Sequence, residues 1–398
     1  PPGIRDPLWS RGLGDVYKRQ EMAPRVDSEV QDVVIVGAGA AGIGVGIAIA
    51  HAGIENFLIV DRDTVGSSFS SWPEETRFIT PSFPSNSIGM LDLNSIAIGI
   101  SPAFSMKVEH PTGKEYAEHL QDIAEYFELP ILENTNVDSI EKIDGLFHLN
   151  IGDGNLLAKN VIWAAGEYQY PLLDGFEGVE LCRHTATVSR YADLEGDNFL
   201  IIGGYESGID AAYHLANNGK KVVLFDINSP WDEESSDPSI TLSTFSFERM
   251  RNANFENNVR LNPQTPVKSV NLVNGTYEVR TQDGQVFNSD SKPLFAGGFD
   301  GSHKFVSDFF DEREDGFPLL NESDESTLVP GMFLCGPSVR HDGHIFCFIF
   351  KYRQRFAIVA QAIASSLDIP TDEFVEAYRG WGMYLDDLSC CGQECLTC

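Results

Sequence analysis

The chain carries one pattern of apolar and polar positions twice. Each copy contains a short apolar run, a glycine-rich turn, a longer apolar segment, and a second short apolar run that ends at an acidic residue. The first copy covers residues 32–63, and the second covers residues 197–228. A short apolar run bounded by glycines indicates a buried strand, and the longer segment after the turn indicates a helix. The pattern therefore predicts two units of the α/β class, each built on parallel strands.

The segments outside the two copies predict how these units are connected. Thr112 and Glu115 form a capping box that opens an amphipathic helix before the second copy. The other expected elements, in chain order, are short strands at 137–140, 146–151 and 160–164, then at 267–273, 276–281 and 293–296, the strand GMFLCG at 331–336, and a long helix from about 344 to 367. This late return of a strand and a helix predicts that the second unit is inserted into the first.

We interpret the chain as an α/β protein of two Rossmann-like, three-layer domains, the second inserted into the first. The first domain then has two parts, residues 30–167 and 296–385, around a second domain at 168–295. Residues 1–29 show no apolar periodicity and are expected to be a disordered or artefactual extension. Residues 386–398 form a cysteine-rich C-terminal tail.

The composition changes which partners we expect. Hydrophobic residues make up 42% of the 398 positions, and 59 acidic residues against 28 basic ones give a net charge of −31. Because such a surface repels phosphates, we expect no nucleic-acid partner and no membrane partner.

Residues 33–50 are long and uncharged enough to resemble a short membrane-spanning segment. They contain five glycines, however, so we interpret them as a buried strand, turn and helix. No secretory signal is visible, and we expect a cytoplasmic protein.

The turn of the first copy has the glycine spacing of a dinucleotide-binding site. Gly37, Gly39 and Gly42 form G-x-G-x-x-G between a strand and a helix, and Asp61 follows nineteen residues after Gly42. Gly37 allows the tight turn, Gly39 lets the backbone approach a pyrophosphate, and Gly42 lets the helix pack on the strand. The N–H groups and the positive dipole end of the helix favour the phosphates. Asp61 is expected to accept hydrogen bonds from the adenosine ribose.

The turn of the second copy departs from this spacing. Gly203 and Gly204 are followed by Tyr205, where the middle glycine belongs, and a ring there obstructs the approach of a pyrophosphate. The unit is therefore either a nicotinamide site or a relic that no longer binds a nucleotide tightly. If a nucleotide binds, Asp226 and the acidic stretch after it repel a 2′-phosphate, so we expect NADH rather than NADPH.

From about residue 30 to 385, the sequence resembles the flavoproteins with two dinucleotide-binding domains, which include thioredoxin reductases and flavin-containing monooxygenases. The resemblance rests on GAGAAG with Asp61, WAAGEYQYP at 163–171, PLFAGGF at 293–299 and GMFLCG at 331–336. It implies FAD in the first domain and a nicotinamide cofactor in the second. For FAD it implies Gly37, Gly39, Ala40, Ala41, Gly42, Asp61, Arg62, Ser68, Trp72, Ala165, Gly166, Gly336 and His344. For the nicotinamide cofactor it implies Gly203, Gly204, Glu206, Ser207 and Asp226.

One loop narrows the resemblance, but the thiols usual in this superfamily are missing. Residues 67–85 are similar to the corresponding loop of bacilliredoxin reductases, the bacillithiol-disulfide branch. That branch places a cysteine in its first glycine motif, where this chain has Ala41, and the usual aspartate after GMFLCG is Pro337. Related reductases carry a dithiol at one of two other positions, and neither dithiol is present here. The first position holds Gly66, Ser67 and Ser68, and the second holds Cys182, Arg183, His184 and Thr185.

Four of the seven cysteines lie in the last nine residues. Cys390 and Cys391 are adjacent, and Cys395 and Cys398 form C-x-x-C. Adjacent cysteines form a strained, easily reduced disulfide, and C-x-x-C pairs often hold a thiol of lowered pKa. The C-terminal LSCC resembles the mobile tail of mercuric reductases. Three interpretations stay open: a redox relay, capture of a soft metal ion, or an exposed tail of unselected composition.

Two other groups of residues carry weaker signals. Cys182 beside His184 is a candidate activated thiol, because a nearby imidazolium stabilises a thiolate. His341, His344 and Cys347 form H-x2-H-x2-C, but positions i, i+3 and i+6 of a helix do not converge. We therefore predict no metal site there and expect these residues to line the flavin pocket.

These observations favour an FAD-dependent NAD(P)H oxidoreductase. Its expected acceptor is a small-molecule or small-protein thiol or disulfide, or a thiol-bound soft metal ion, and a homodimer is allowed for. The catalytic candidates are Cys390, Cys391, Cys395, Cys398 and Cys182. One alternative is a flavin-containing monooxygenase, whose F-x-G-x-x-x-H pattern is not met because His184 falls two residues late. The other alternative is a flavin-binding redox or metal sensor without turnover.

Overall fold

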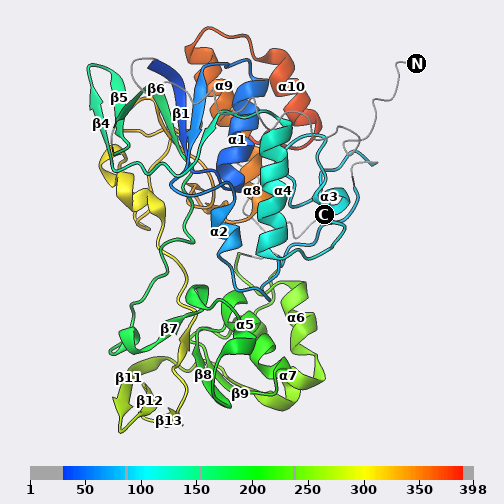
Figure 1. The fold of residues 1–398 in the computed structure, drawn as a ribbon, viewed down its shortest axis with the longest axis vertical. Helices are drawn as coiled ribbons and strands as arrows, with labels where there is room; N and C mark the ends of the chain where they lie inside the picture. Colours follow the sequence, from blue (N-terminus) through cyan, green and yellow to red (C-terminus); the bar gives the residue numbers. More distant parts are fainter. Residues whose placement is uncertain (1–29, 86–87, 153, 236–238, 389–398) are drawn as a thin grey trace.

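The computed structural model describes residues 30–85, 88–152, 154–235 and 239–388. The predicted extension at 1–29 and the four tail cysteines lie outside these residues. The described chain forms two units, drawn one above the other in Figure 1, each with its own mainly parallel sheet. Among the described helices, none combines the length with the apolar character that spanning a bilayer requires.

The sheet of the first unit contains seven strands. They are β1 (Val30–Val36), β2 (Phe57–Val60), β3 (Ile131–Leu132), β4 (Ser139–Ile143), β5 (Leu146–Asn150), β6 (Asn155–Trp163) and β15 (Met332–Leu334). The order is β3-β2-β1-β6-β5-β4, and β15 pairs with the end of β6. β1 lies parallel to β2 and β6, with Val33 opposite Phe57 and Asn160. Its residues 33–36 are buried, as expected for a strand between two parallel neighbours.

Helices cover one side of this sheet. The longer ones are α1 (Ala40–His51), α4 (Gly113–Tyr126), α9 (Phe356–Ser366) and α10 (Asp372–Gly380), and the short ones are α2 (Ser67–Ser70), α3 (Pro102–Met106) and α8 (Ile349–Tyr352). Figure 1 shows α1, α4 and α9 side by side to the right of the sheet. The capping box of α4 is confirmed, because Thr112 Oγ1 accepts from the Glu115 N–H and the Glu115 carboxylate accepts from the Thr112 N–H. Gly44 lets α1 lie close to α9, since a Cβ there would come 2.1 Å from the Phe356 ring.

The second unit has a five-stranded parallel sheet and a small antiparallel one. The parallel strands are β7 (Arg183–His184), β8 (Asn198–Ile202), β9 (Lys221–Phe225), β10 (Val259–Asn262) and β14 (Leu294–Phe295), in the order β10-β9-β8-β14-β7. Its helices are α5 (Glu206–Asn217), α6 (Thr244–Met250) and α7 (Ala253–Asn258). The antiparallel strands are β11 (Val267–Val273), β12 (Thr276–Thr281) and β13 (Val286–Ser289), of which the first two have the predicted bounds. All these strands lie in the chain between β6 and β15, which is the order that an inserted domain requires.

The long helix predicted from His344 is wrong in its first part. The chain instead forms a hairpin of β16 (Arg340–His341) and β17 (His344–Ile345), and helical structure begins at α8. The residues between the two strands are Asp342 and Gly343, and an Asp-Gly pair favours a two-residue hairpin loop. Asp342 has a φ of +47°, the left-handed conformation that such a loop requires. This local turn signal outweighs the apolar pattern of the following residues.

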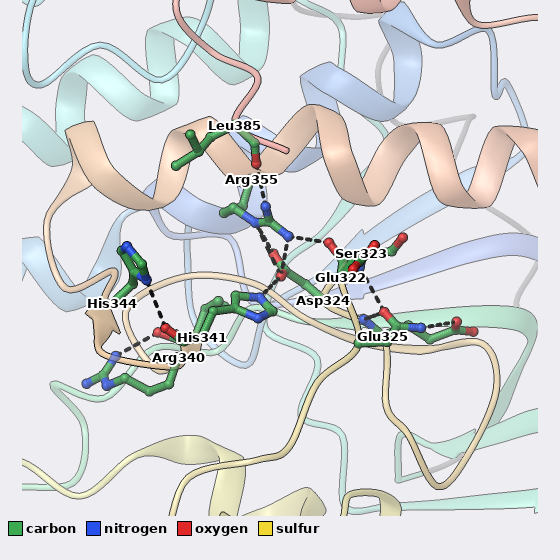
Figure 2. A network of polar contacts seen from close by, with 11 residues as sticks. Glu322, Ser323, Asp324, Glu325, Arg340, His341, His344, Arg355 and Leu385 are labelled. Carbon is green, nitrogen blue, oxygen red and sulfur yellow. Dashed lines mark hydrogen bonds and ion pairs between the residues drawn. The ribbon is translucent and has the colours of Figure 1, made fainter. Parts of the chain in front are cut away.

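A buried ionic cluster fixes this hairpin to the rest of the first unit. Asp324 accepts hydrogen bonds from His341 Nε2 at 2.5 Å and from Arg355 Nη2 at 2.8 Å. Arg355 also donates to the carbonyl oxygens of Glu322 at 2.6 Å and Leu385 at 2.5 Å. Figure 2 shows Arg355 at the centre of these contacts. Asp324 and Arg355 together thus join the hairpin, the loop that carries Asp324 and the segment near the end of the described chain.

Hydrogen bonds also join the two units. Thr76 Oγ1 donates to Asp210 Oδ2 of α5 at 2.7 Å. The Glu75 carboxylate accepts from the N–H groups of Tyr191 at 3.1 Å and Ala192 at 3.0 Å. These contacts hold the loop after α2 against the second unit, and they set how the two units face each other.

Candidate functional site

A cavity of about 430 Å³ lies between the two units. The first unit contributes the first glycine turn and α2 to its wall, and the second contributes Glu206, Asp210 and Arg249. A second cavity of about 290 Å³ extends along the first unit. The two cavities share lining residues, namely Gly37, Asp61, Ser67, Ser68 and Ala165. Together they form a site that runs from α5 across the first glycine turn to the end of β2.

The first glycine turn has the conformation that its sequence predicts. Gly37 has a φ of +110°, and a Cβ there would lie 2.5 Å from the Ala164 carbonyl oxygen. A Cβ on Gly42 would lie 1.8 Å from the Gly37 carbonyl oxygen, so α1 can pack here only without a side chain. Gly39 faces open space, and the first turn of α1 carries no acidic residue. The N-terminus of α1 is therefore open to the cavity, where an anionic pyrophosphate is favoured.

Asp61 borders the other end of this site. Its carboxylate accepts from the N–H groups of Ala38 at 2.7 Å and Asp63 at 2.8 Å. Burial raises the pKa of Asp61, while the two backbone N–H groups act in the opposite direction. The carboxylate lines the smaller cavity together with Arg62 and Ser68. An open turn, a free helix N-terminus and a carboxylate near a small side cavity fit an adenine dinucleotide such as FAD.

Most of the residues predicted to bind the cofactors line one of these cavities. They are Gly37, Gly39, Ala40, Ala41, Asp61, Arg62, Ser68, Trp72, Ala165, Gly166, Glu206 and Ser207. Gly336 lies just behind the wall, where a Cβ would come 3.1 Å from the Ala41 Cβ. The predicted helical setting of His344 is wrong, because the hairpin carries this residue and its Nδ1 lies 3.0 Å from the His341 carbonyl oxygen. Its contact with FAD stays a prediction.

Another part of the cavity wall was largely missed by sequence reasoning. Phe348, Ile349 and Tyr352 supply part of it from the start of α8, and Tyr168 supplies another part. Cys347 lines the cavity, as expected, with its Sγ 3.1 Å from Ser239 Oγ, and burial raises the pKa of this thiol. For Tyr168 a signal was available in WAAGEYQYP, the stretch that also supplied the predicted FAD-binding residues Ala165 and Gly166.

The three residues of the H-x2-H-x2-C motif do not converge. His341 contacts Asp324, His344 contacts the backbone of the hairpin, and Cys347 contacts Ser239. In the part of the chain that the structure describes, no group of three or more His, Cys, Asp or Glu side chains is arranged to hold a metal ion.

Cys182 is not placed as the activated thiol that we predicted. It lies 4% exposed in the core of the second unit, and burial raises its pKa to about 12. His184 does not face it as a base, because one ring nitrogen accepts from the Ala186 N–H and the other lies 2.9 Å from the Gly298 carbonyl oxygen. The catalytic prediction for Cys182 is therefore contradicted by its burial.

We expect Cys182→Ala to leave nicotinamide-dependent turnover within about twofold of the unchanged protein, because this thiol does not reach the cavity. Steady-state oxidation of NADH, normalised to bound flavin, measures this. Because the variant loses one buried sulfur, its free energy of unfolding should fall by about 1 kcal/mol. A fall of about tenfold or more at equal flavin content would restore Cys182 as a catalytic candidate.

The second glycine turn repeats the backbone of the first. Gly203 has a φ of +99°, and a Cβ there would lie 2.5 Å from the Ala296 carbonyl oxygen. Asp226 Oδ2 accepts from the Gly204 N–H at 2.7 Å, as Asp61 does from Ala38. The second unit therefore keeps the framework of a dinucleotide site.

Comparison with known proteins adds a family to this geometry. A family model described as pyridine nucleotide-disulphide oxidoreductase matches residues 34–336. The uncharacterized oxidoreductase CzcO-like of Geobacillus kaustophilus is 34% identical over 113 residues, which are 27% of this chain and 32% of that protein. The F component of the alkyl hydroperoxide reductase of Staphylococcus epidermidis is 25% identical over 325 residues, which are 78% of this chain and 54% of that protein. The chain thus spans only part of the length of these curated relatives.

Solved structures share the fold at low sequence identity. Bacillithiol disulfide reductase Bdr (YpdA) from Staphylococcus aureus has a TM-score of 0.69 and 18% identity, with 85% of this chain and 99% of that one covered. A flavin-containing monooxygenase from Stenotrophomonas maltophilia has a TM-score of 0.64 and 15% identity, with 85% and 100% covered. Reductases and monooxygenases are thus both among the similar structures, and the predicted α/β class with two dinucleotide-binding domains is confirmed.

Proposed function

Because the chain belongs to the family of pyridine nucleotide-disulphide oxidoreductases, we propose that it uses bound FAD to oxidise NADH and reduce a disulfide. The observation that carries this proposal is that the cavity of about 430 Å³ reaches both the first glycine turn and the start of α5. One dinucleotide on each unit brings the two reactive rings into this shared space. FAD, when bound, supplies the hydride-accepting ring, and the protein supplies binding and orientation.

The first unit is the proposed FAD site. The N–H groups at the start of α1 hold the pyrophosphate, and Gly39 leaves the room that the phosphates need. Asp61 holds the adenosine ribose through its carboxylate. Trp72 and Tyr168 border the cavity with ring centroids 6.3 Å apart and give it an aromatic wall.

The second unit is the proposed NADH site. Asp226 Oδ1 accepts from the N–H groups of Asn228 at 2.7 Å and Ser229 at 2.6 Å, which fixes the carboxylate at the end of β9. A 2′-phosphate at this place meets a negative charge, and the following WDEE stretch adds three more. These charges support NADH over NADPH.

The proposed acceptor is a small-molecule or small-protein disulfide, reached through the thiols of the C-terminal tail. Among the described residues, the free cysteines are Cys182, Cys335 and Cys347, and the first two are buried. A structurally similar protein is named bacillithiol disulfide reductase, which supports a small-molecule disulfide as the acceptor. A soft metal ion held by the tail is the second proposed acceptor, and a homodimer in the cytoplasm stays a prediction.

Changing all four tail cysteines to serine tests the route to the acceptor. We expect disulfide-dependent NADH oxidation to fall about a hundredfold, because serine cannot exchange with a disulfide, while reduction of the flavin by NADH stays within about twofold. Oxidised glutathione and bacillithiol disulfide serve as acceptors, with Thr397→Ala as the matched tail control. Unchanged turnover in the four-serine variant would place the acceptor chemistry elsewhere.

A flavin-containing monooxygenase is the second candidate, and the absence of a paired thiol among the described residues that line the cavity favours it. Such an enzyme consumes oxygen in proportion to an organic substrate. The four-serine variant distinguishes the two activities, because oxygen consumption does not depend on tail thiols.

A further inference from the structure

The two glycine turns have the same backbone conformation but differ in the residue that caps the helix. Tyr205 caps α5 with φ −80° and ψ −167°, and Gly39 caps α1 with φ −82° and ψ −169°. A Cβ built on Gly39 meets no atom within 4 Å, so a side chain at this position points into the open space before the helix. Tyr205 therefore sends its side chain into the space that the first unit leaves free for a pyrophosphate.

Tyr205 is held in that space by the rest of the second unit. Its hydroxyl donates to the Thr241 carbonyl oxygen at 2.8 Å. The Trp231 ring covers the neighbouring Gly204, since a Cβ on Gly204 would come 2.3 Å from it. The segment that follows β9 is thus folded back over the glycine turn.

Glu206 makes a second connection, between the first turn of α5 and the start of α6. Its carboxylate accepts from the Ser243 N–H at 2.5 Å and from Ser246 Oγ at 2.6 Å, which ties the start of α6 to the first turn of α5. The corresponding residue of α1 is Ala40. A carboxylate in the first turn occupies the place that the helix dipole otherwise offers to a phosphate. Burial raises the pKa of Glu206, while the two serines and Arg249 act in the opposite direction.

We propose that Glu206 and Tyr205 form a latch over the N-terminus of α5, and that the diphosphate of the nicotinamide cofactor binds only when Glu206 releases Ser243. This inference rests on the proposed NADH site and adds its regulation. Glu206 is a positioning residue here, because it acts through α6 rather than on the reacting atoms. The ligand class that it governs is a dinucleotide diphosphate.

The charges around Glu206 make it the group whose protonation opens the latch. Arg249 of α6 donates to Asp210 of α5 at 2.5 Å and to Ser246 Oγ at 3.1 Å. Because Ser246 Oγ in turn donates to Glu206, Arg249 contacts Asp210 directly and Glu206 only through this serine. Hydrogen bonds and charges from His214 and Arg249 hold the pKa of Asp210 at about 2 despite its burial. Asp226 lies on the other side of the turn, bonded to Gly204. The contact with Arg249 favours the ionised form of Asp210, whereas protonation of Glu206 weakens its hydrogen bond with Ser243 and removes a charge that repels phosphate.

Calorimetric binding of ADP-ribose and of adenosine to the FAD-loaded protein tests the latch. We expect Glu206→Gln to bind ADP-ribose about tenfold more tightly, because the repelling charge is gone, and to bind adenosine unchanged. Tyr205→Phe, which loses the hydroxyl that donates to Thr241, should gain about threefold. Glu248→Gln removes an equal charge from an exposed position of α6 and should change binding by less than about twofold.

A pH series separates this role from a merely structural one. The affinity of the unchanged protein for ADP-ribose should fall as pH rises through the ionisation of Glu206, and the Glu206→Gln profile should be flat. Equal affinities and equal pH profiles in the two proteins would overturn the latch, even if NADH still reduces the flavin. If ADP-ribose binds neither protein and NADH leaves the flavin oxidised in both, the proposed NADH site fails together with its latch.

Discussion

Replacing Asp324 by asparagine will lower the free energy of unfolding by about 3 to 5 kcal/mol. Asp324 is fully buried, and Arg355, which it pairs with, is only 1% exposed. Asparagine keeps the shape of the side chain but leaves the guanidinium charge without its counter-ion in a dry environment. Urea unfolding followed by circular dichroism measures the change.

An exposed ion pair provides the matched control. Asp315 accepts from Arg313 Nε at 3.1 Å, and its side chain is 44% exposed. Asp315→Asn should cost less than about 1 kcal/mol, because water screens this pair. If Asp324→Asn is as mild as Asp315→Asn, the cluster in Figure 2 does not hold the hairpin in place.

Replacing Gly42 by alanine will reduce FAD binding by about a hundredfold or more. The new Cβ would stand 1.8 Å from the Gly37 carbonyl oxygen, so the start of α1 must move away from the turn. A displacement of this order removes the N–H groups from the pyrophosphate. FAD retained per chain after gel filtration measures the loss, and the FAD-free protein should also be less stable.

Gly39→Ala separates cofactor binding from folding. Its Cβ meets no protein atom within 4 Å, so unfolding of the FAD-free protein should change by less than about 1 kcal/mol. FAD binding should still weaken by about tenfold, because the methyl group takes up space that the pyrophosphate needs. Full FAD retention by Gly39→Ala would show that the phosphates do not lie at this turn.

Strong local signals explain what could be predicted from the sequence. The capping box from Thr112 to Glu115 and the strands β11 and β12 have their predicted positions, because each depends on neighbouring residues only. Gly42 belongs to the same class, since a Cβ there would meet the Gly37 carbonyl oxygen within one strand–turn–helix unit, whereas Gly37 is constrained by Ala164, which lies far away in the chain.

The parts that could not be predicted depend on residues far apart in the chain. The hairpin at Asp342 is stabilised by Asp324 and Arg355, which no local pattern connects to it. The cavity brings Arg249 of the second unit near the first glycine turn, and only the packing of the two units determines this. Cys182 looked reactive beside His184 in sequence, but burial, which the sequence did not reveal, raises the pKa of its thiol.

Anaerobic titration of the FAD-loaded protein with NADH tests the central claim most directly. We expect the visible absorption of the oxidised flavin to disappear, at lower concentrations of NADH than of NADPH. If the tail thiols share the electrons, complete reduction should consume more NADH than the flavin alone accepts. A flavin spectrum that NADH leaves unchanged would contradict the proposed oxidoreductase.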